Sequence, residues 1–226
     1  VCIIKWNNSN NKSFENRWKK IEAFASIFLY WPISIGTNQK KYDINICMGE
    51  MQMIIINSLK DMLEKSGKVY GSKTAYKIRK NENEYLEITH NEVRQMVDAL
   101  GTSLVNMGLK NKKIGVIGEN RYEWEIAYLS IVCGTGIVVP LDKSLPDNEL
   151  KRLIERSEIE AIFYSKKYTD FFTKGKIGKL KYLISMDIKE NNDLEYSQYQ
   201  LIREGNELLE KGNKEFVDAQ IDNKKM

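Results

Sequence analysis

The residues best placed for chemistry follow the first buried strand that the sequence predicts. Residues 114–117 form a short apolar run with high β-branched content, and Gly118, Glu119 and Arg121 come directly after it. Charged groups in this position can bind ligands, because open α/β sheets bind them beyond the carboxyl ends of their strands. Helix capping and a surface ion pair are the alternative roles for Glu119 and Arg121.

Two other kinds of site find little support. Gly115 and Gly118 are spaced like part of a dinucleotide-binding loop, but the G-x-G-x-x-G fingerprint is absent, so we do not predict one. The chain has one histidine, His90, and a Ser-His-Asp or Cys-His mechanism would have to use it. His90 lies beside a predicted helix start, which favours a surface role.

Cysteine usage and charge restrict the class of protein. The three cysteines, Cys2, Cys47 and Cys133, are far apart and odd in number, which indicates a reducing, cytoplasmic compartment rather than a disulfide or zinc framework. We expect Cys133 to pack as a small hydrophobe. The formal net charge is +4, and most of the surplus lies in the first fifty residues. The remainder is nearly neutral, so no nucleic-acid partner is predicted.

A strand, a helix and a second strand within residues 113–142 must position the strand-end groups. An apolar repeat at helical spacing indicates the helix: Trp124, Ala127, Tyr128 and Ile131. Gly134 and Gly136 end this pattern, and residues 137–139 form the second strand, which Pro140 closes. Two strands joined by a helix imply a right-handed parallel βαβ unit. The predicted fold class is therefore α/β, with a parallel sheet flanked by helices.

The segment before this unit carries clear local signals. Ser58 and Asp61 cap a short helix that we expect to stop at Gly67. Residues 74–78 and 85–88 flank a polar turn and predict a β-hairpin near the start of the fold. A capping box of Thr89 and Glu92 then opens an amphipathic helix that Gly108 ends.

The segment after the unit alternates between helices and strands. A helix starts after Pro146, and its apolar positions Leu150, Leu153 and Ile154 are expected to face inward. A strand at residues 159–164, a short helix at 166–172, a strand at 182–185 and a helix at 199–209 follow. The chain therefore adds further strands to one sheet.

The first 52 residues are poorly patterned. The codons of Gly49 and Glu50 resemble a bacterial ribosome-binding sequence just upstream of Met53, so we interpret residues 1–52 as a translated leader that is not native coding sequence. A signal peptide fits poorly, because acidic residues interrupt the basic region and Pro32 breaks the short apolar run. A short interfacial helix stays open as an alternative, with these aromatic residues at a membrane surface: Trp18, Phe24, Phe28 and Trp31.

Three stretches together resemble one protein family. Residues 85–93, YLEITHNEV, and residues 134–142, GTGIVVPLD, are similar to two motifs of the AMP-forming acyl-CoA synthetases. Residues 118–124, GENRYEW, resemble the wording of the long-chain fatty acid branch, of a bacterial, clostridial-like type. The resemblance covers roughly residues 58–226 and implies the amino-terminal subdomain of the adenylate-forming large domain.

The resemblance also implies a chemistry. The parent reaction joins a fatty acid to CoA through an acyl-AMP intermediate, with ATP and Mg²⁺ as cofactors. Ile221 and Asp222 match the segment that precedes the family's glycine-rich phosphate-binding loop, and that loop has no counterpart in this sequence. No catalytic residue and no metal ligand therefore carry over. Lys166 and Lys167 are the candidates for binding the CoA 3′-phosphate, and a solvated helix start is the alternative.

Two functions stay open. The first is an incomplete long-chain fatty acid–CoA ligase that is inactive alone and whose partners are fatty acid, CoA and the remainder of the enzyme. Peripheral membrane contact is open for it, because fatty acids partition into bilayers. The second is a non-enzymatic α/β module that binds a nucleotide, an acyl group or a protein. An incomplete domain should expose a large apolar surface, whereas a finished module should be soluble and unfold cooperatively.

Overall fold

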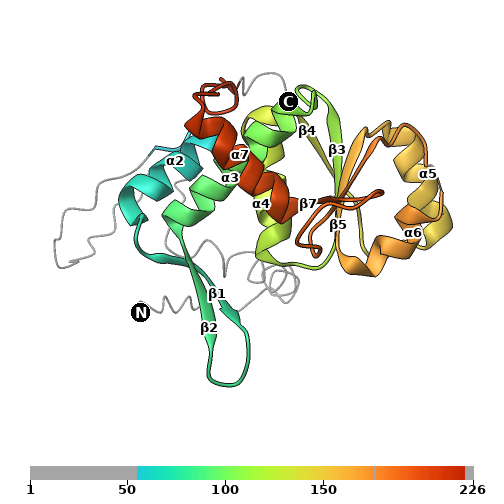
Figure 1. Cartoon of the computed structure of the whole chain (residues 1–226), viewed down its shortest axis with the longest axis horizontal. Coiled ribbons are helices and arrows are strands. Elements are labelled where there is room, and N and C mark those ends of the chain that lie inside the picture. Colours follow the sequence, from blue (N-terminus) through green and yellow to red (C-terminus); the bar gives the residue numbers. More distant parts are fainter. Residues whose placement is uncertain (1–54, 176, 222–226) are drawn as a thin grey trace, which may run out of the picture. The chain divides into compact units, whose positions relative to one another are not determined.

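Five parallel strands form the centre of the described chain (Figure 1). The computed structural model describes residues 55–175 and 177–221, so the predicted leader and its interfacial-helix alternative lie outside the described residues. The sheet has the order β4-β3-β5-β6-β7. Its strands are β3 (Lys113–Ile117), β4 (Ile137–Pro140), β5 (Ala161–Tyr164), β6 (Tyr182–Ser185) and β7 (Tyr196–Ser197). All four pairings are parallel, which confirms the predicted α/β class.

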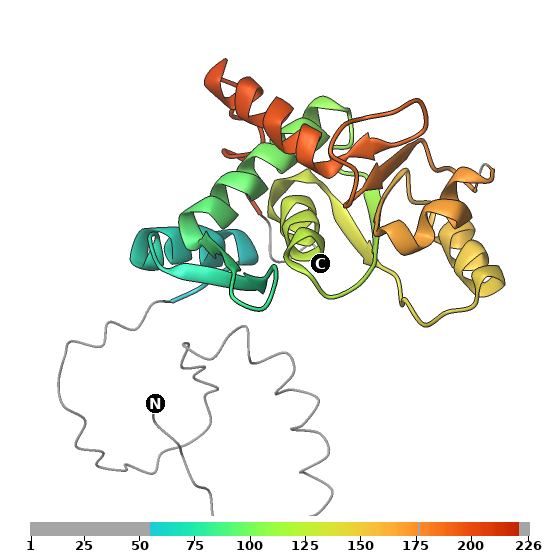
Figure 2. The ribbon, with the colours of Figure 1, turned by 60° about the horizontal axis from the view of Figure 1, so that its bottom comes forward.

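Helices cover both faces of this sheet, as the two views show (Figures 1 and 2). On one face lie α3 (His90–Asn106) and α4 (Tyr122–Ser130), with α7 (Gln198–Glu210) packed against α3. On the other face lie α5 (Asp147–Ser157) and α6 (Thr169–Thr173). Because side chains alternate along a strand, β5 sends Phe163 into the first core and Ile162 into the second. The sheet is thus buried on both faces, which explains its continuous apolar strands.

The helix and strand that follow β3 complete the predicted βαβ unit. A π-helical turn, η1 (Ile131–Thr135), ends α4, and Gly134 within it has φ 157°. Two residues of the expected apolar face, Ala127 and Ile131, are fully buried. The rings of Trp124 and Tyr128 are half-buried and stack at 5.5 Å. The repeat therefore located the helix correctly.

A β-hairpin and a capped helix come before the sheet, as predicted. Strands β1 (Thr74–Arg79) and β2 (Tyr85–Thr89) pair antiparallel, and the hairpin extends away from the sheet in Figure 1. The capping box is present, since the Glu92 N–H donates to Thr89 Oγ1 at 3.3 Å and the Thr89 N–H donates to Glu92 Oε2 at 2.6 Å. Gly108 adopts φ 78° just beyond α3, the conformation expected after a helix.

Two local predictions were wrong because tertiary packing overrides them. Helix α2 (Leu59–Tyr70) does not stop at Gly67 but continues to Tyr70. Gly67 is buried there, and a Cβ on it would lie 3.2 Å from Arg94 Cδ on α3, so this glycine permits close packing rather than a helix end. Leu153 is 40% exposed, whereas Leu150 and Ile154 are fully buried, so α5 presents a narrower apolar stripe than expected.

The segment after α7 packs against the body, which local patterns did not indicate. Phe216 is 1% exposed and lies so close to α3 that a Cβ on Gly101 would meet its ring at 2.2 Å. The Lys60 ammonium on α2 donates to the carbonyls of Phe216, Val217 and Ala219 at 3.1, 2.7 and 2.6 Å. These bonds join the two ends of the described chain.

Candidate functional site

The sheet reverses its strand order between β3 and β5. From β3 the chain passes through α4 to β4 on one side, and then crosses to β5 on the other side. This arrangement is a topological switch point, where open parallel sheets bind ligands beyond the carboxyl ends of their strands. Five residues gather there and form what we call the switch-point cluster: Glu119, Arg121, Ser165, Lys166 and Asp187.

Arg121 joins the ends of β3 and β6 within this cluster. Its Nη1 donates to Asp187 Oδ1 at 2.7 Å, and its Nη2 donates to the Met186 carbonyl at 3.0 Å. Its Nε donates to Glu123 Oε2 at 2.8 Å. Burial alone would lower the Arg121 pKa, but hydrogen bonds to Glu123 and Asp187 outweigh it and raise the pKa. Arg121 therefore forms the ion pairs that the alternative predicted, and it also occupies the N-cap position of α4, although its side chain makes no capping bond there.

Asp187 also reaches the end of β5. Its Oδ2 accepts a hydrogen bond of 2.6 Å from the backbone N–H of Lys166. Lys166 is the first residue of the turn η2 (Lys166–Tyr168). Ser165 precedes that turn, but its side chain makes no capping bond. One carboxylate therefore connects the carboxyl ends of three adjacent strands, a role that was not predicted from the sequence. Its position two residues after a predicted strand was the signal that could have indicated it.

Glu119 is ionised within the cluster. The neighbouring Ser165 hydroxyl, its own backbone N–H and Arg121 hold the Glu119 pKa below its usual range. Ser165 is 1% exposed, and its hydroxyl makes no hydrogen bond of good geometry in the described structure. Its dipole near the carboxylate still favours the charged form. Glu119 therefore presents an acceptor, not an acid, at the carboxyl end of β3.

The two lysines predicted to bind phosphate lie on the η2 turn. Lys166 and Lys167 are exposed, and neither forms an ion pair with any residue that the structure describes. The Lys167 ammonium lies 5.4 Å from the centre of the Tyr168 ring. Tyr168 is 6% exposed and donates to the Lys143 carbonyl at 3.0 Å. The turn therefore has a buried anchor, and its two ammonium groups remain available to an anion.

Behind Arg121 lies a second polar layer. Glu123, 7% exposed, accepts from Arg121 and from the Tyr199 hydroxyl, the latter at 2.8 Å. The Gln198 side-chain N–H donates to the Glu123 carbonyl at 2.9 Å. These contacts tie the start of α4 to the start of α7. The layer stabilises the position of Arg121 and has no exposed reactive group of its own.

The histidine and the described cysteine lie elsewhere. His90 is the first residue of α3, half-buried, with its ring 5.6 Å from that of Tyr70. Burial lowers the His90 pKa. Cys133 is fully buried, which raises the pKa of its thiol to about 12 and confirms that it is a packing residue. The structure brings neither residue to the switch-point cluster.

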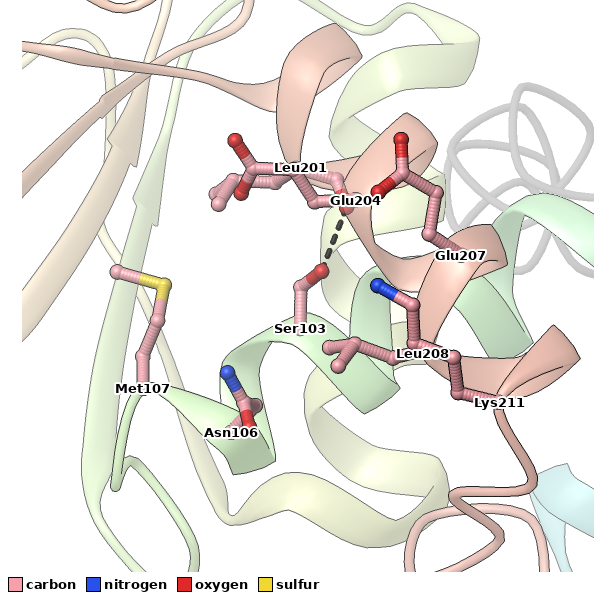
Figure 3. A pocket seen from close by; sticks show the side chains of 8 residues that line it. All are labelled: Ser103, Asn106, Met107, Leu201, Glu204, Glu207, Leu208 and Lys211. Atoms are coloured by element: carbon pink, nitrogen blue, oxygen red, sulfur yellow. Dashed lines mark hydrogen bonds between the residues drawn. The ribbon is translucent and has the colours of Figure 1, made fainter.

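Two hollows occur away from the cluster. A cavity of about 160 Å³ lies between α3 and α7, and Figure 3 shows the Ser103 hydroxyl in it donating to the Leu201 carbonyl, at 2.6 Å. Its charged lining residues come from α7 and the residue that directly follows it: Glu204, Glu207 and Lys211. A second hollow of about 290 Å³ lies beside Lys60, whose ammonium is already bound to three carbonyls. Neither hollow contains a predicted site residue.

The described residues contain no group of three or more His, Cys, Asp or Glu side chains suited to hold a metal ion. Nor is any helix among them long and apolar enough to cross a membrane.

The fold and the cluster define an open parallel α/β layer with charged groups at its switch point. Residues 63–218 match the family described as AMP-binding enzyme. The match covers more than half of the chain, so the chain belongs to the AMP-binding enzyme family.

Several curated proteins are similar to parts of the chain. The medium/long-chain-fatty-acid–CoA/3-oxocholest-4-en-26-oate–CoA ligase of Mycolicibacterium smegmatis is 29% identical over 85 residues, which are 37% of this chain and 15% of that protein. Long-chain-fatty-acid–CoA ligase 1 of Homo sapiens is 24% identical over 39% of this chain and 13% of that protein. Fatty acyl-CoA synthetase B of Dictyostelium discoideum is 29% identical over 49% of this chain and 17% of that protein. The chain thus matches less than a fifth of the length of each relative.

Solved structures agree on the fold. A long-chain-fatty-acid–CoA ligase from Archaeoglobus fulgidus superposes with a TM-score of 0.56 and 14% identity, over 72% of this chain and 33% of that one. The anthranilate–CoA ligase AuaEII in complex with anthranoyl-AMP gives a TM-score of 0.56 with 18% identity, over 69% and 29% of the two chains. The α/β layer with its preceding hairpin is therefore the fold that these ligases share with this chain.

Proposed function

We propose that this chain is part of an AMP-forming long-chain fatty acid–CoA ligase of bacterial, clostridial-like type. The family match supports the AMP-binding class, and the names of the three curated relatives support a fatty acid as the acid substrate. In this proposal residues 53–226 are the amino-terminal α/β portion of the AMP-binding domain, and residues 1–52 are the leader. The parent reaction uses ATP, Mg²⁺ and CoA and takes place in the cytoplasm, with peripheral contact to the membrane that holds the fatty acid.

The contribution of this portion is to bind CoA. Lys166 and Lys167 hold the 3′-phosphate of the nucleotide, because two ammonium groups without carboxylate partners lie beyond the carboxyl end of β5 at the switch point. This is the observation that carries the assignment. Each contact is a solvent-exposed ion pair worth roughly 0.5–1 kcal/mol, so the two together correspond to about a tenfold gain in affinity.

A matched pair of ligands tests the assignment. CoA and 3′-dephospho-CoA differ only in the group that the lysines are proposed to bind. Titration calorimetry of the chain should show about tenfold tighter binding of CoA, and Lys166→Ala with Lys167→Ala should remove this preference. Equal affinity for both ligands in the unaltered chain, or no binding of either, would show that the assignment is wrong.

We also propose that the chain alone does not activate fatty acids, because its sequence has no glycine-rich loop to hold the ATP phosphates. Exchange of labelled pyrophosphate into ATP in the presence of palmitate measures acyl-AMP formation directly. We expect no exchange above background from the purified chain. Exchange by the chain alone would contradict this, whereas specific binding of a protein or an acyl group without CoA preference would favour the non-enzymatic module.

A further inference from the structure

We propose that Asp187 is a positioning residue for the η2 turn (Lys166–Tyr168), which we call the lysine turn. Its carboxylate fixes the η2 backbone from which the Lys166 and Lys167 side chains leave, and so determines whether both ammonium groups meet one phosphate. The inference rests on the proposed function of these lysines as the 3′-phosphate site.

The first support is the geometry of the turn. The η2 turn contains three residues, and the Ser165 side chain does not cap it. The bond from the Lys166 N–H to Asp187 Oδ2, at 2.6 Å, supplies the missing cap from a residue 21 positions away. At the other end the buried Tyr168 side chain anchors the turn. The turn is therefore held at both ends, by Asp187 at its start and by Tyr168 at its end.

The negative charge of Asp187 is neutralised by an ion pair with Arg121. A carboxylate beside an anion site is unfavourable unless another group neutralises it. Arg121 does so, since its Nη1 lies 2.7 Å from Asp187 Oδ1, and the Asp187 side chain is only 26% exposed. Arg121 is in turn held by Glu123, which is 7% exposed. The lysine turn is thus linked through Asp187 and Arg121 to the buried start of α4.

This arrangement leads to two opposite expectations for one substitution. Asp187→Ala removes a negative charge near Lys166, so a purely electrostatic role predicts that CoA binds more tightly. A positioning role predicts the reverse, because the turn loses its cap and the two ammonium groups no longer point to one place. The quantity to measure is the ratio of the dissociation constants of 3′-dephospho-CoA and CoA. Partial unfolding would weaken the binding of both ligands by the same factor and leave this ratio unchanged.

Three variants complete the experiment. We expect Asp187→Ala to reduce the roughly tenfold preference for CoA to less than about twofold. Asp187→Asn should retain an intermediate preference, because its amide oxygen can still accept the Lys166 N–H. Asp170→Ala is the matched control: it removes the same charge from nearby α6, its side chain is 86% exposed, and its ion pair with Lys174 does not involve the turn. It should keep the full preference.

The outcomes separate this inference from the proposed function. A preference that persists or grows in Asp187→Ala, while the double lysine variant loses it, would overturn the positioning role and leave the lysine site intact. Absence of any preference in the unaltered chain would overturn both. Hydrogen exchange gives a readout that needs no ligand: the Lys166 amide should exchange faster in Asp187→Ala than in Asp170→Ala, and equal rates would contradict the cap.

Discussion

Arg121 has a structural role at the switch point of the parallel sheet. It lies in the sequence motif that resembles a ligase family. Each of its three guanidinium nitrogens nevertheless donates to a protein group: Glu123, Asp187 or the Met186 carbonyl. The side chain is 28% exposed, and three of its five N–H donors, one on each guanidinium nitrogen, are used in these contacts. Arg121 therefore organises the site, while Lys166 and Lys167 are the groups available to an anion.

Replacing Arg121 should destabilise the fold, because it leaves the buried carboxylate of Glu123 without its cationic partner. Arg121→Met leaves Glu123 with the Tyr199 hydroxyl as its remaining side-chain partner, so we expect a loss of about 2 kcal/mol in the free energy of unfolding. Adding Glu123→Gln should restore part of that loss, because the buried charge is removed. Urea unfolding of the two single variants and the double variant measures the coupling. Strictly additive losses would contradict the ion pair.

Glu160 directly precedes β5, at the amino ends of the strands, and its ion pairs should make stability depend on pH. Hydrogen bonds from Lys112 and Lys181, at 2.8 Å each, lower the pKa of Glu160 to about 2 from an ordinary value of 4.5. A lowered folded-state pKa stabilises the fold above the unfolded value, and this stabilisation disappears as the pH falls from about 4.5 towards 2. Thermal unfolding across this range should therefore show a shallower decline for Glu160→Gln than for the unaltered chain. Parallel curves would mean that these ion pairs do not contribute.

At the scale of elements, the contact between α3 and α7 depends on a glycine. A Cβ on Gly205 would lie 1.9 Å from the Ala99 carbonyl oxygen, which is a backbone atom that cannot rotate away. The Ser103 hydroxyl bonds to the Leu201 carbonyl across the same contact. This close approach explains why α7 lies directly on α3 although the two helices are about a hundred residues apart in sequence.

Gly205→Ala should force the two helices apart. We expect it to lower the free energy of unfolding by about 3 kcal/mol, at the upper end of the cost of overpacking. Gly175→Ala is the matched control, because a Cβ there meets nothing within 4 Å and should leave the stability within about 0.5 kcal/mol. Calorimetric melting of both variants checks this. Equal effects at the two positions would show that α3 and α7 do not approach this closely.

The edge strand β4 is short and contains a residue that limits pairing with a further strand. Ile137 and Leu141 direct their N–H groups towards β3, bonding to the carbonyls of Lys112 and Val116 at 2.9 Å. By alternation, residue 140 faces outward, and Pro140 has no N–H to offer another strand there. The proline therefore limits pairing along this edge, although Ile137 is 57% exposed.

At the scale of the whole described unit, two cores share one sheet. Leu100 on α3 belongs to the first core and Leu150 on α5 to the second, and both are fully buried. Because every central strand contributes side chains to both cores, neither can unfold while the other keeps its sheet. The two cores should therefore unfold together, whichever of the two candidate functions the chain has.

Matched substitutions test this cooperativity. Leu100→Ala and Leu150→Ala should each cost about 2–5 kcal/mol, and both should shift the same urea transition. Circular dichroism and hydrogen exchange of amides in β3 should report coincident midpoints for each variant. A variant that shifts only one of two separate transitions would show that the cores are independent.

Much of the fold could be predicted because its signals are local. The capping box of Thr89 and Glu92 and the apolar repeat in residues 124–131 each involve residues within about four positions of one another. Beyond them, the boundaries of β6 were predicted to the residue. Gly67 was misread because its glycine signal also fits close helix packing, and β7 was missed because two residues carry no periodicity.

The sequence by itself determined the helices, most strands, the parallel α/β class and the strand-end groups Glu119, Arg121 and Lys166. Only the tertiary structure showed that Asp187, 66 residues from Arg121 and 21 from Lys166, joins these groups. The physical reason is that capping and amphipathic periodicity act within one element, whereas the order of strands in a sheet depends on burying both faces at once. The switch-point cluster follows from that order, so no local pattern could have assembled it.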